Sequence, residues 1–112
     1  MRRQKSYSGE SGYVYQYFYE GYRRVRSATE FVFQVSSAGK PAFPVTVLLQ
    51  DDAVKSWETS HGRPLDSTER YAVAKIALFR AFDERPTPNH LREAIRVRPA
   101  DIGEILDYLG ID

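Results

Sequence analysis

The chain has 112 residues and no cysteine, and its 16 basic and 15 acidic side chains give a formal net charge of +1. This length suits one domain, and the lack of thiols excludes disulfide cross-links, thiolate nucleophiles and zinc sites built on cysteine. The balanced charge excludes an overall attraction to nucleic acid or anionic lipid, so any such preference must come from local clustering. Val, Ile, Leu and Phe contribute 27 of the 112 residues, enough for a modest packed core.

The N-terminal segment, residues 1–12, is polar and rich in Ser and Gly. A secretory signal needs an apolar stretch directly behind its basic residues, and this segment has none. The apolar runs elsewhere are far shorter than the ~20 residues that span a bilayer. We therefore expect a flexible tail over residues 1–12, a single domain over residues 13–112, a cytoplasmic location and no membrane partner.

Residues 13–22 read YVYQYFYEGY, with a tyrosine at every odd position from 13 to 19. Aromatic density and a period of two are typical of a β-strand. The four-residue spacing of Val14, Phe18 and Tyr22 also fits a helix, but aromatic side chains lose rotamer freedom there and Gly21 weakens a helix further. We predict a strand that is apolar or aromatic on both faces.

Two further strands are predicted at residues 30–36 and 45–49, where apolar residues again alternate along the chain. The segment SAGKP at residues 37–41 supplies the turn between them. Pro44 cannot donate a ladder hydrogen bond, so it marks the start of the third strand or places that strand at an edge. The three strands together predict an antiparallel meander.

A helical period begins after Gln50. Asp51 or Asp52 can cap a helix that runs to residue 60 or 61, because a carboxylate there accepts hydrogen bonds from the first free amides. Gly62 can end this helix in a left-handed conformation, and Pro64 prevents its continuation.

The core helix is predicted to begin at Asp66 and to end before Pro86. Asp66 and Glu69 have the spacing of a capping box, and the run TERYAVAKIALFRAFDE follows. On a helical wheel its apolar residues, Tyr71 among them, form one broad face, so this helix should cover the sheet.

The C-terminal region contains a short strand, residues 94–98, and a last helix that Pro99 opens. Gly110 followed by Ile111 fits a Schellman ending. The predicted order is strand–strand–strand–helix–helix–strand–helix. This order indicates the α+β class, with an antiparallel sheet of three or four strands covered on one face by about three helices.

A Tyr- and Arg-rich segment carries the clearest functional signal. Six of the eight tyrosines lie between Tyr7 and Tyr22, and residues 1–26 hold six basic and two acidic side chains, a local charge of +4 against −3 for the rest. If helices cover only one face of the sheet, the other face leaves aromatic side chains uncovered, as interfaces do. The candidate partner-binding residues are Tyr13, Tyr15, Tyr17, Tyr19, Arg23, Arg24 and Arg26.

Several interpretations of this segment remain open. The simplest is structural, with tyrosines in a half-buried strand and arginines in a solvated turn. The leading functional hypothesis is a non-enzymatic protein-interaction or regulatory module that uses the Tyr/Arg sheet face, with another protein or a second copy as partner, such as in a homodimer. The alternative on the same face is single-stranded nucleic acid, since rings stack on bases and guanidinium groups hold phosphates.

Lys75 is the one charged residue predicted on the apolar side of the core helix, near Tyr71. Its stem must pack while its ammonium reaches water or a carboxylate, which is ordinary behaviour for lysine. A desolvated Lys75 with a lowered pKa could instead act as a base or nucleophile in a pocket with Tyr71, which gives a third hypothesis, a small ligand-binding domain or enzyme. His61 and His90 lack partners at metal-ligand spacing. We expect no metal site, no cofactor and, more readily than an enzyme, a binding protein.

Overall fold

The computed structural model describes residues 3–112. In this range the chain forms five strands, three α-helices and one short 3-10 helix in an α+β arrangement. The elements are β1 (Lys5–Ser8), β2 (Val14–Val25), β3 (Ala28–Ser37), β4 (Phe43–Gln50), α1 (Asp51–His61), α2 (Ser67–Glu84), η1 (Pro88–Arg92), β5 (Ile95–Val97) and α3 (Pro99–Leu109).

The sheet is mixed and has the strand order β1-β2-β3-β4-β5 in the described residues. The first four strands are antiparallel, and β5 runs parallel to β4, with Val47 opposite Ile95. The expected sheet of three or four antiparallel strands is therefore wrong in strand number and in the direction of β5. The crossover from β4 to β5 contains α1, α2 and the 3-10 helix η1, which is the long connection that a parallel pair requires.

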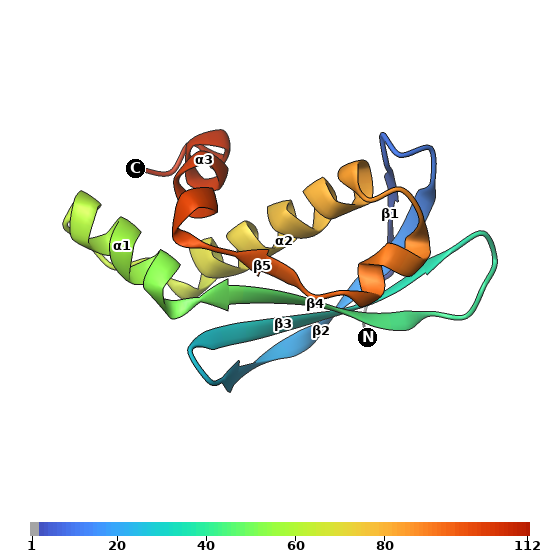
Figure 1. Cartoon of the computed structure of the whole chain (residues 1–112), viewed down its shortest axis with the longest axis horizontal. Coiled ribbons are helices and arrows are strands. Elements are labelled where there is room, and N and C mark those ends of the chain that lie inside the picture. Colours follow the sequence, from blue (N-terminus) through green and yellow to red (C-terminus); the bar gives the residue numbers. More distant parts are fainter. Residues whose placement is uncertain (1–2) are drawn as a thin grey trace.

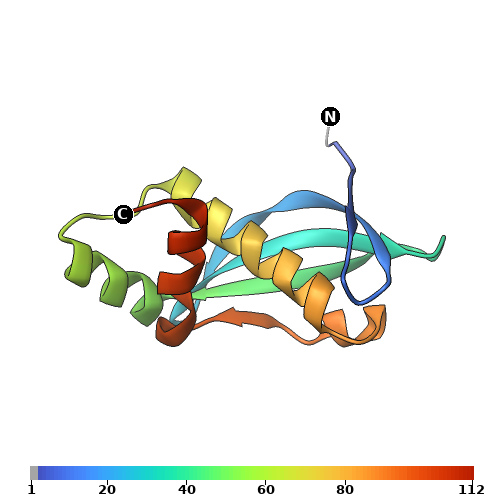
Figure 2. The ribbon, with the colours of Figure 1, turned by 90° about the horizontal axis from the view of Figure 1, so that it is seen from above.

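The three α-helices lie on one side of the sheet (Figure 1), as expected for a one-sided cover. Viewed from above, α2 crosses the strands diagonally (Figure 2). Its buried residues, Val73, Ala74, Ala77, Leu78, Ala81 and Phe82, pack on the alternating buried residues of β3 and β4. The opposite face of the sheet carries no helix in the part of the chain that is described.

Most helix ends follow the local signals. The start of α1 does not: its N-cap is Gln50 and no side chain caps it, so the predicted cap at Asp51 or Asp52 is wrong, and both aspartates lie in the first turn. Asp66 accepts a hydrogen bond from the Glu69 amide at 2.7 Å, and the Glu69 carboxylate accepts one from the Asp66 amide, so the capping box is confirmed. Gly62 and Gly110 end α1 and α3 in the left-handed conformation, with φ of 67° and 74°. The Ile111 amide donates to the Leu106 carbonyl, which closes the Schellman motif.

The N-terminal segment is not a free tail over residues 5–12. Lys5–Ser8 forms β1, which pairs with Val14–Tyr17 of β2. The turn behind it closes on the end of α2, because the Ser11 hydroxyl donates to the Phe82 carbonyl at 2.7 Å and the Glu10 amide donates to Asp83 at 3.0 Å. The first bond satisfies one of the backbone carbonyls that a helix C-terminus leaves free, and the second binds the Asp83 side-chain carboxylate.

A β-bulge in β2 changes which side chains face the helices. Tyr19 lies opposite Phe33 and Gly21 lies opposite Val32, so Glu20 is an extra residue, and Gly21 adopts a φ of 150° that favours glycine. Before the bulge the odd-numbered residues face α2. After it Tyr22 pairs with buried Phe31, so the even-numbered residues face the helices instead.

Two glycine-to-alanine substitutions test this packing. A Cβ on Gly9 would lie 2.6 Å from the Phe82 carbonyl oxygen, whereas a Cβ on Gly103 in α3 would meet nothing within 4 Å. We expect Gly9→Ala to lower the free energy of unfolding by about 1–3 kcal/mol through overpacking. Gly103→Ala should raise it by about 0.5–1 kcal/mol, because alanine restricts the unfolded chain. Urea denaturation gives the free energy of unfolding of both variants. An unchanged value for Gly9→Ala would contradict the close contact between the turn and α2.

Candidate functional site

The tyrosines of β2 divide into a buried and a partly exposed group. Tyr15 and Tyr17 have exposed fractions of 0% and 5%, because the odd-numbered face of β2 is the face that α2 covers. The Tyr15 ring stacks on Phe82 with centroids 4.3 Å apart, and Tyr17 meets Phe79 edge-on at 5.5 Å. The expectation that these two rings belong to a recognition face is therefore wrong, since they form part of the core.

The other two candidate tyrosines, Tyr13 and Tyr19, are half-buried at opposite ends of this row. Tyr13 lies beside Tyr15, with centroids 6.3 Å apart. Tyr19 packs on Tyr71 of α2 at 4.7 Å and on Phe33 at 5.3 Å, and it keeps part of its ring at the surface.

Two of the three candidate arginines hold neighbouring carboxylates. Arg23 donates to Glu30 across the β2–β3 hairpin at 2.7 Å. Arg24 forms a bidentate ion pair with Asp51 of α1, with Nη1–Oδ1 and Nη2–Oδ2 distances of 2.8 and 2.7 Å. This contact lowers the pKa of the Asp51 carboxyl. Arg26 is exposed and has no carboxylate partner in the described part of the chain.

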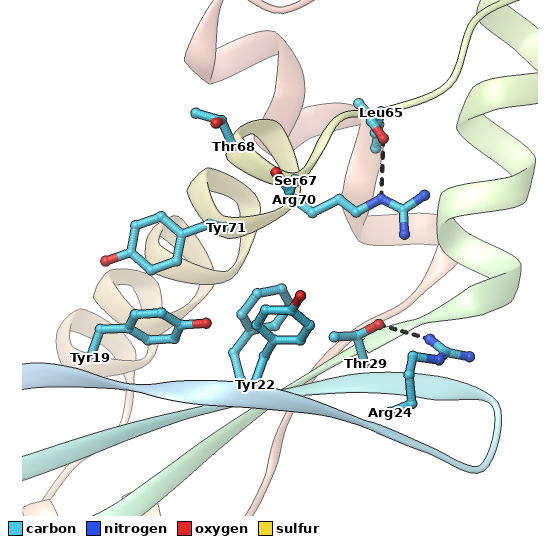
Figure 3. Close-up of a pocket in the computed structure, with 10 residues that line it drawn as sticks. Tyr19, Tyr22, Arg24, Thr29, Leu65, Ser67, Thr68, Arg70 and Tyr71 are labelled. Carbon is cyan, nitrogen blue, oxygen red and sulfur yellow. Dashed lines mark hydrogen bonds between the residues drawn. The ribbon is translucent and has the colours of Figure 1, made fainter.

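An aromatic groove opens between β2 and the first two turns of α2 (Figure 3). Its cavity volume is about 480 Å³, within the ~300–1,000 Å³ of small-ligand pockets. We define the aromatic groove by the ten residues that line it, Tyr19, Tyr22, Arg24, Thr29, Phe31, Leu65, Ser67, Thr68, Arg70 and Tyr71.

The walls of the aromatic groove are rings. Tyr22 is 66% exposed and lies over Phe31 with centroids 5.9 Å apart, while Tyr19 and Tyr71 close the opposite end. Burial raises the pKa of the Tyr19 and Tyr71 phenols, so both are neutral at physiological pH. The groove thus offers neutral aromatic surface with hydroxyl groups at its edge.

Two guanidinium groups border these rings. Besides its contact with Asp51, Arg24 donates to the Thr29 hydroxyl at 2.7 Å. Arg70 donates through Nε to the Leu65 carbonyl at 3.2 Å and lies 3.5 Å from the Glu58 carboxylate. Both side chains are held in place before anything enters the groove.

The predicted pocket residues Lys75 and Tyr71 have different surroundings. Tyr71 lines the aromatic groove, but Lys75 does not. The Lys75 ammonium lies 5.7 Å from the Phe79 ring centroid, and its pKa is lowered by burial first and by nearby Lys5 second. No carboxylate pairs with Lys75 among the described residues.

The histidines have structural contacts. His61 stacks on Trp57 with centroids 4.0 Å apart and its Nδ1 lies 2.9 Å from the Trp57 carbonyl oxygen. His90 lies 2.8 Å from the Thr87 hydroxyl. Within residues 3–112 no three His, Asp or Glu side chains gather as metal ligands would. In the same range, the helices are too short or too polar to cross a bilayer.

Sequence reasoning missed Tyr22, Phe31 and Arg70 as site residues. Unbroken alternation puts Tyr22 on the face opposite Tyr15 and Tyr17, and the bulge moves it to the same face as these tyrosines. Gly21 was the available signal, because an isolated glycine within a strand pattern often marks a bulge. Arg70 reaches the groove only through the diagonal path of α2, which no local pattern encodes.

The tyrosine contacts predict a loss of stability in alkali. Burial, aided by the hydrogen bond to Asp83, raises the pKa of Tyr7 to about 12. Its ordinary value is near 10, so the folded chain keeps a proton that the unfolded chain releases, and stability present below pH ~10 is lost as the pH rises toward 12. We expect the free energy of unfolding, measured by urea denaturation at stepped pH, to fall less steeply for Tyr7→Phe than for the parent. Identical slopes would contradict this role.

Lys75→Met tests whether this lysine has only a packing role. The ammonium is half-buried without a carboxylate partner in the described residues, so we expect the melting temperature to stay unchanged or to rise. Lys55→Met on the exposed side of α1 is the matched control and should change stability by no more than about 0.5 kcal/mol. Circular dichroism melts measure both, and a destabilisation above ~1 kcal/mol at Lys75 alone would show that its ammonium makes a stabilising contact, which contradicts a role limited to packing.

Comparison with known proteins found no matching family model, no matching curated protein and no matching solved structure. The proposal for function therefore rests on the geometry of the aromatic groove and the charged residues beside it.

Proposed function

We propose that this chain is a non-enzymatic protein-interaction module, and that it binds an apolar or aromatic side chain of its partner in the aromatic groove. One observation carries this proposal. Tyr22, a large aromatic side chain, is 66% exposed beside Tyr19, Tyr71 and Phe31, and no segment of the described chain fills the space between them. Rings arranged in this way are the groups that dominate binding energy at protein interfaces.

The chemistry of the groove favours binding over catalysis. Its titratable side chains are tyrosines and the two arginines, and Arg24 and Arg70 are already paired with Asp51 and Glu58. A catalytic site needs a nucleophile or a base within hydrogen-bond reach of a second polar group, with a place for the reacting atom. The groove instead offers apolar area with a polar border, which is the pattern of an interface anchor site.

The groove is also organised before a partner arrives. Arg24 donates hydrogen bonds to Asp51 of α1 and to Thr29 of β3, and Tyr71 packs on Tyr19. Side chains that are already ordered lose less conformational entropy on association, so more of the contact energy remains as affinity. Of the predicted Tyr/Arg sheet face, Tyr19 and Arg24 belong to the proposed binding surface. Tyr22, Arg70 and Tyr71 complete this surface.

Single-stranded nucleic acid receives less support from this arrangement. The rings of Tyr15 and Tyr17 stack inside the core, and Arg23 and Arg24 are paired with carboxylates. A stacking platform needs open rings beside unpaired cations. A small aromatic ligand is the better second candidate, because the cavity of about 480 Å³ can hold one between the rings that line it.

A selection experiment tests the proposal. Random linear peptides displayed on phage are selected on the immobilised chain, and the binding of an enriched peptide is measured by fluorescence anisotropy. We expect Tyr22→Ala to weaken binding by at least about ten-fold, as loss of an interface aromatic residue does. Tyr108→Ala is the matched control, since Tyr108 on α3 is 71% exposed and lies outside the groove, and its affinity should match the parent.

Two results would contradict the proposal. The first is that no peptide is enriched, and the second is that Tyr22→Ala and Tyr108→Ala bind equally well. Chemical shift changes at Tyr22 and Tyr71 caused by small aromatic carboxylates, together with a failed peptide selection, would assign the groove to a small ligand instead.

A further inference from the structure

We infer that the partner enters the aromatic groove as an extended, acidic chain segment that adds a strand to the edge of β2 over Tyr22–Val25. This inference rests on the proposed function and specifies the form of the partner. It follows from the main-chain edge of β2, the position of the groove along that edge and the charges around it.

The first observation is the edge itself. β1 pairs with β2 only over Val14–Tyr17, and among residues 3–112 no strand lies beside the outer edge of Tyr22–Val25. Every second residue of an edge strand points its amide and carbonyl groups away from the sheet, where another strand can bind them. Residues 22–25 pair in regular register with 31–28 of β3, so no bulge interrupts this part of the edge.

The second observation is that the groove runs beside this edge. Tyr22 and Arg24 come from β2, and Ser67, Arg70 and Tyr71 come from the facing turns of α2 (Figure 3). A strand added to β2 would lie on the open side of Tyr22, with the beginning of α2 above it. Main-chain hydrogen bonds would then supply affinity and the groove would supply selectivity, which is the general logic of strand addition.

The third observation is the alternation of side chains along β2 after the bulge. Tyr22 and Arg24 face the helices, and Arg23 faces the open side of the sheet, where its side chain is 72% exposed. Side chains directly opposite each other in paired strands lie on the same face. A partner residue opposite Tyr22 therefore enters the groove, and its neighbour opposite Arg23 lies beside a guanidinium group.

Charge selects the partner. Arg23, Arg24 and Arg26 lie within four residues, Glu30 and Asp51 balance two of them, and Arg26 has no carboxylate partner in the described residues. Pairing this edge with the same edge of a second copy would place arginines against arginines. An acidic residue opposite Arg23 would meet a guanidinium group that is 72% exposed, and Arg26 adds an unpaired cation beside it. The expected partner sequence therefore alternates an aromatic or large aliphatic residue with Asp or Glu.

Hydrogen exchange of the complex tests the strand. In the complex with an enriched peptide, we expect the outward-facing backbone amides of residues 22–25 to exchange hydrogen at least about ten-fold more slowly than in the free chain. The reason is that a paired strand protects these amides from water. A peptide N-methylated at one ladder position should bind about five- to ten-fold more weakly than its unmethylated form, since one main-chain hydrogen bond is lost. The control is methylation of the neighbouring peptide amide, which points away from β2, and it should have little effect on affinity.

The acidic preference has its own variant. Arg26→Glu removes the unpaired cation and disturbs no ion pair in the described residues, so the fold should persist. We expect weaker binding of the enriched peptide and a smaller loss of affinity on adding salt. Unchanged affinity, or enriched peptides without Asp or Glu, would overturn the acidic partner.

The outcomes separate this inference from the proposed function. Peptides that need Tyr22 but leave the 22–25 amides unprotected would overturn the added strand and keep the groove as an anchor site. If every enriched peptide binds Tyr22→Ala as tightly as the parent, both the added strand and the aromatic groove as an anchor site are overturned. Sedimentation of the free chain as a dimer that Tyr22→Ala dissociates would replace the acidic partner with a second copy.

Discussion

The stacking of β2 tyrosines on the aromatic side of α2 is the contact on which the rest of the molecule depends. Tyr15 lies flat on Phe82 with centroids 4.3 Å apart, and Tyr7 of β1 stacks in the same way on Phe79 at 4.4 Å. Aromatic pairs of this kind contribute about 0.5–1.5 kcal/mol beyond the area they bury. They hold the second half of α2 to the start of the sheet and draw β1 into place. The first half of α2 carries no such rings except Tyr71, so the sheet beneath it stays partly uncovered.

The bulge at Glu20 and Gly21 converts this incomplete cover into a site. An unbroken strand would turn Tyr22 to the face without helices, where a lone aromatic side chain on a flat surface offers a partner little enclosure. The extra residue turns it toward α2, opposite Phe31 and near Tyr71. A local irregularity in one strand thus decides whether the uncovered rings form a groove, and bulges are often found where a side chain has to be redirected for function.

The ion pairs around the groove have an orienting role more than a stabilising one. Arg24 and Asp51 are both substantially exposed, and exposed pairs contribute little to stability because water screens them. Their geometry still fixes the guanidinium group against Thr29 at the border of the groove. Arg23 and Arg26 lie on the same hairpin beside the groove, so the shape and the exposed cations that the proposal uses are at one end of the sheet.

The sequence alone determined the elements whose signals are local. The capping box at Asp66, the left-handed glycine at Gly62 and the proline at Pro99 act within one helical turn, so they can be read without knowing what lies nearby. Tertiary structure decided the rest. Lys5–Ser8 is too polar to be predicted as a strand from its sequence, and it forms one because it pairs with β2 and packs on α2. The direction of β5 follows from a crossover that contains α1, α2 and η1. Period-two alternation shows that a strand has two faces, but packing against α2 decides which face is buried and which rings stay exposed.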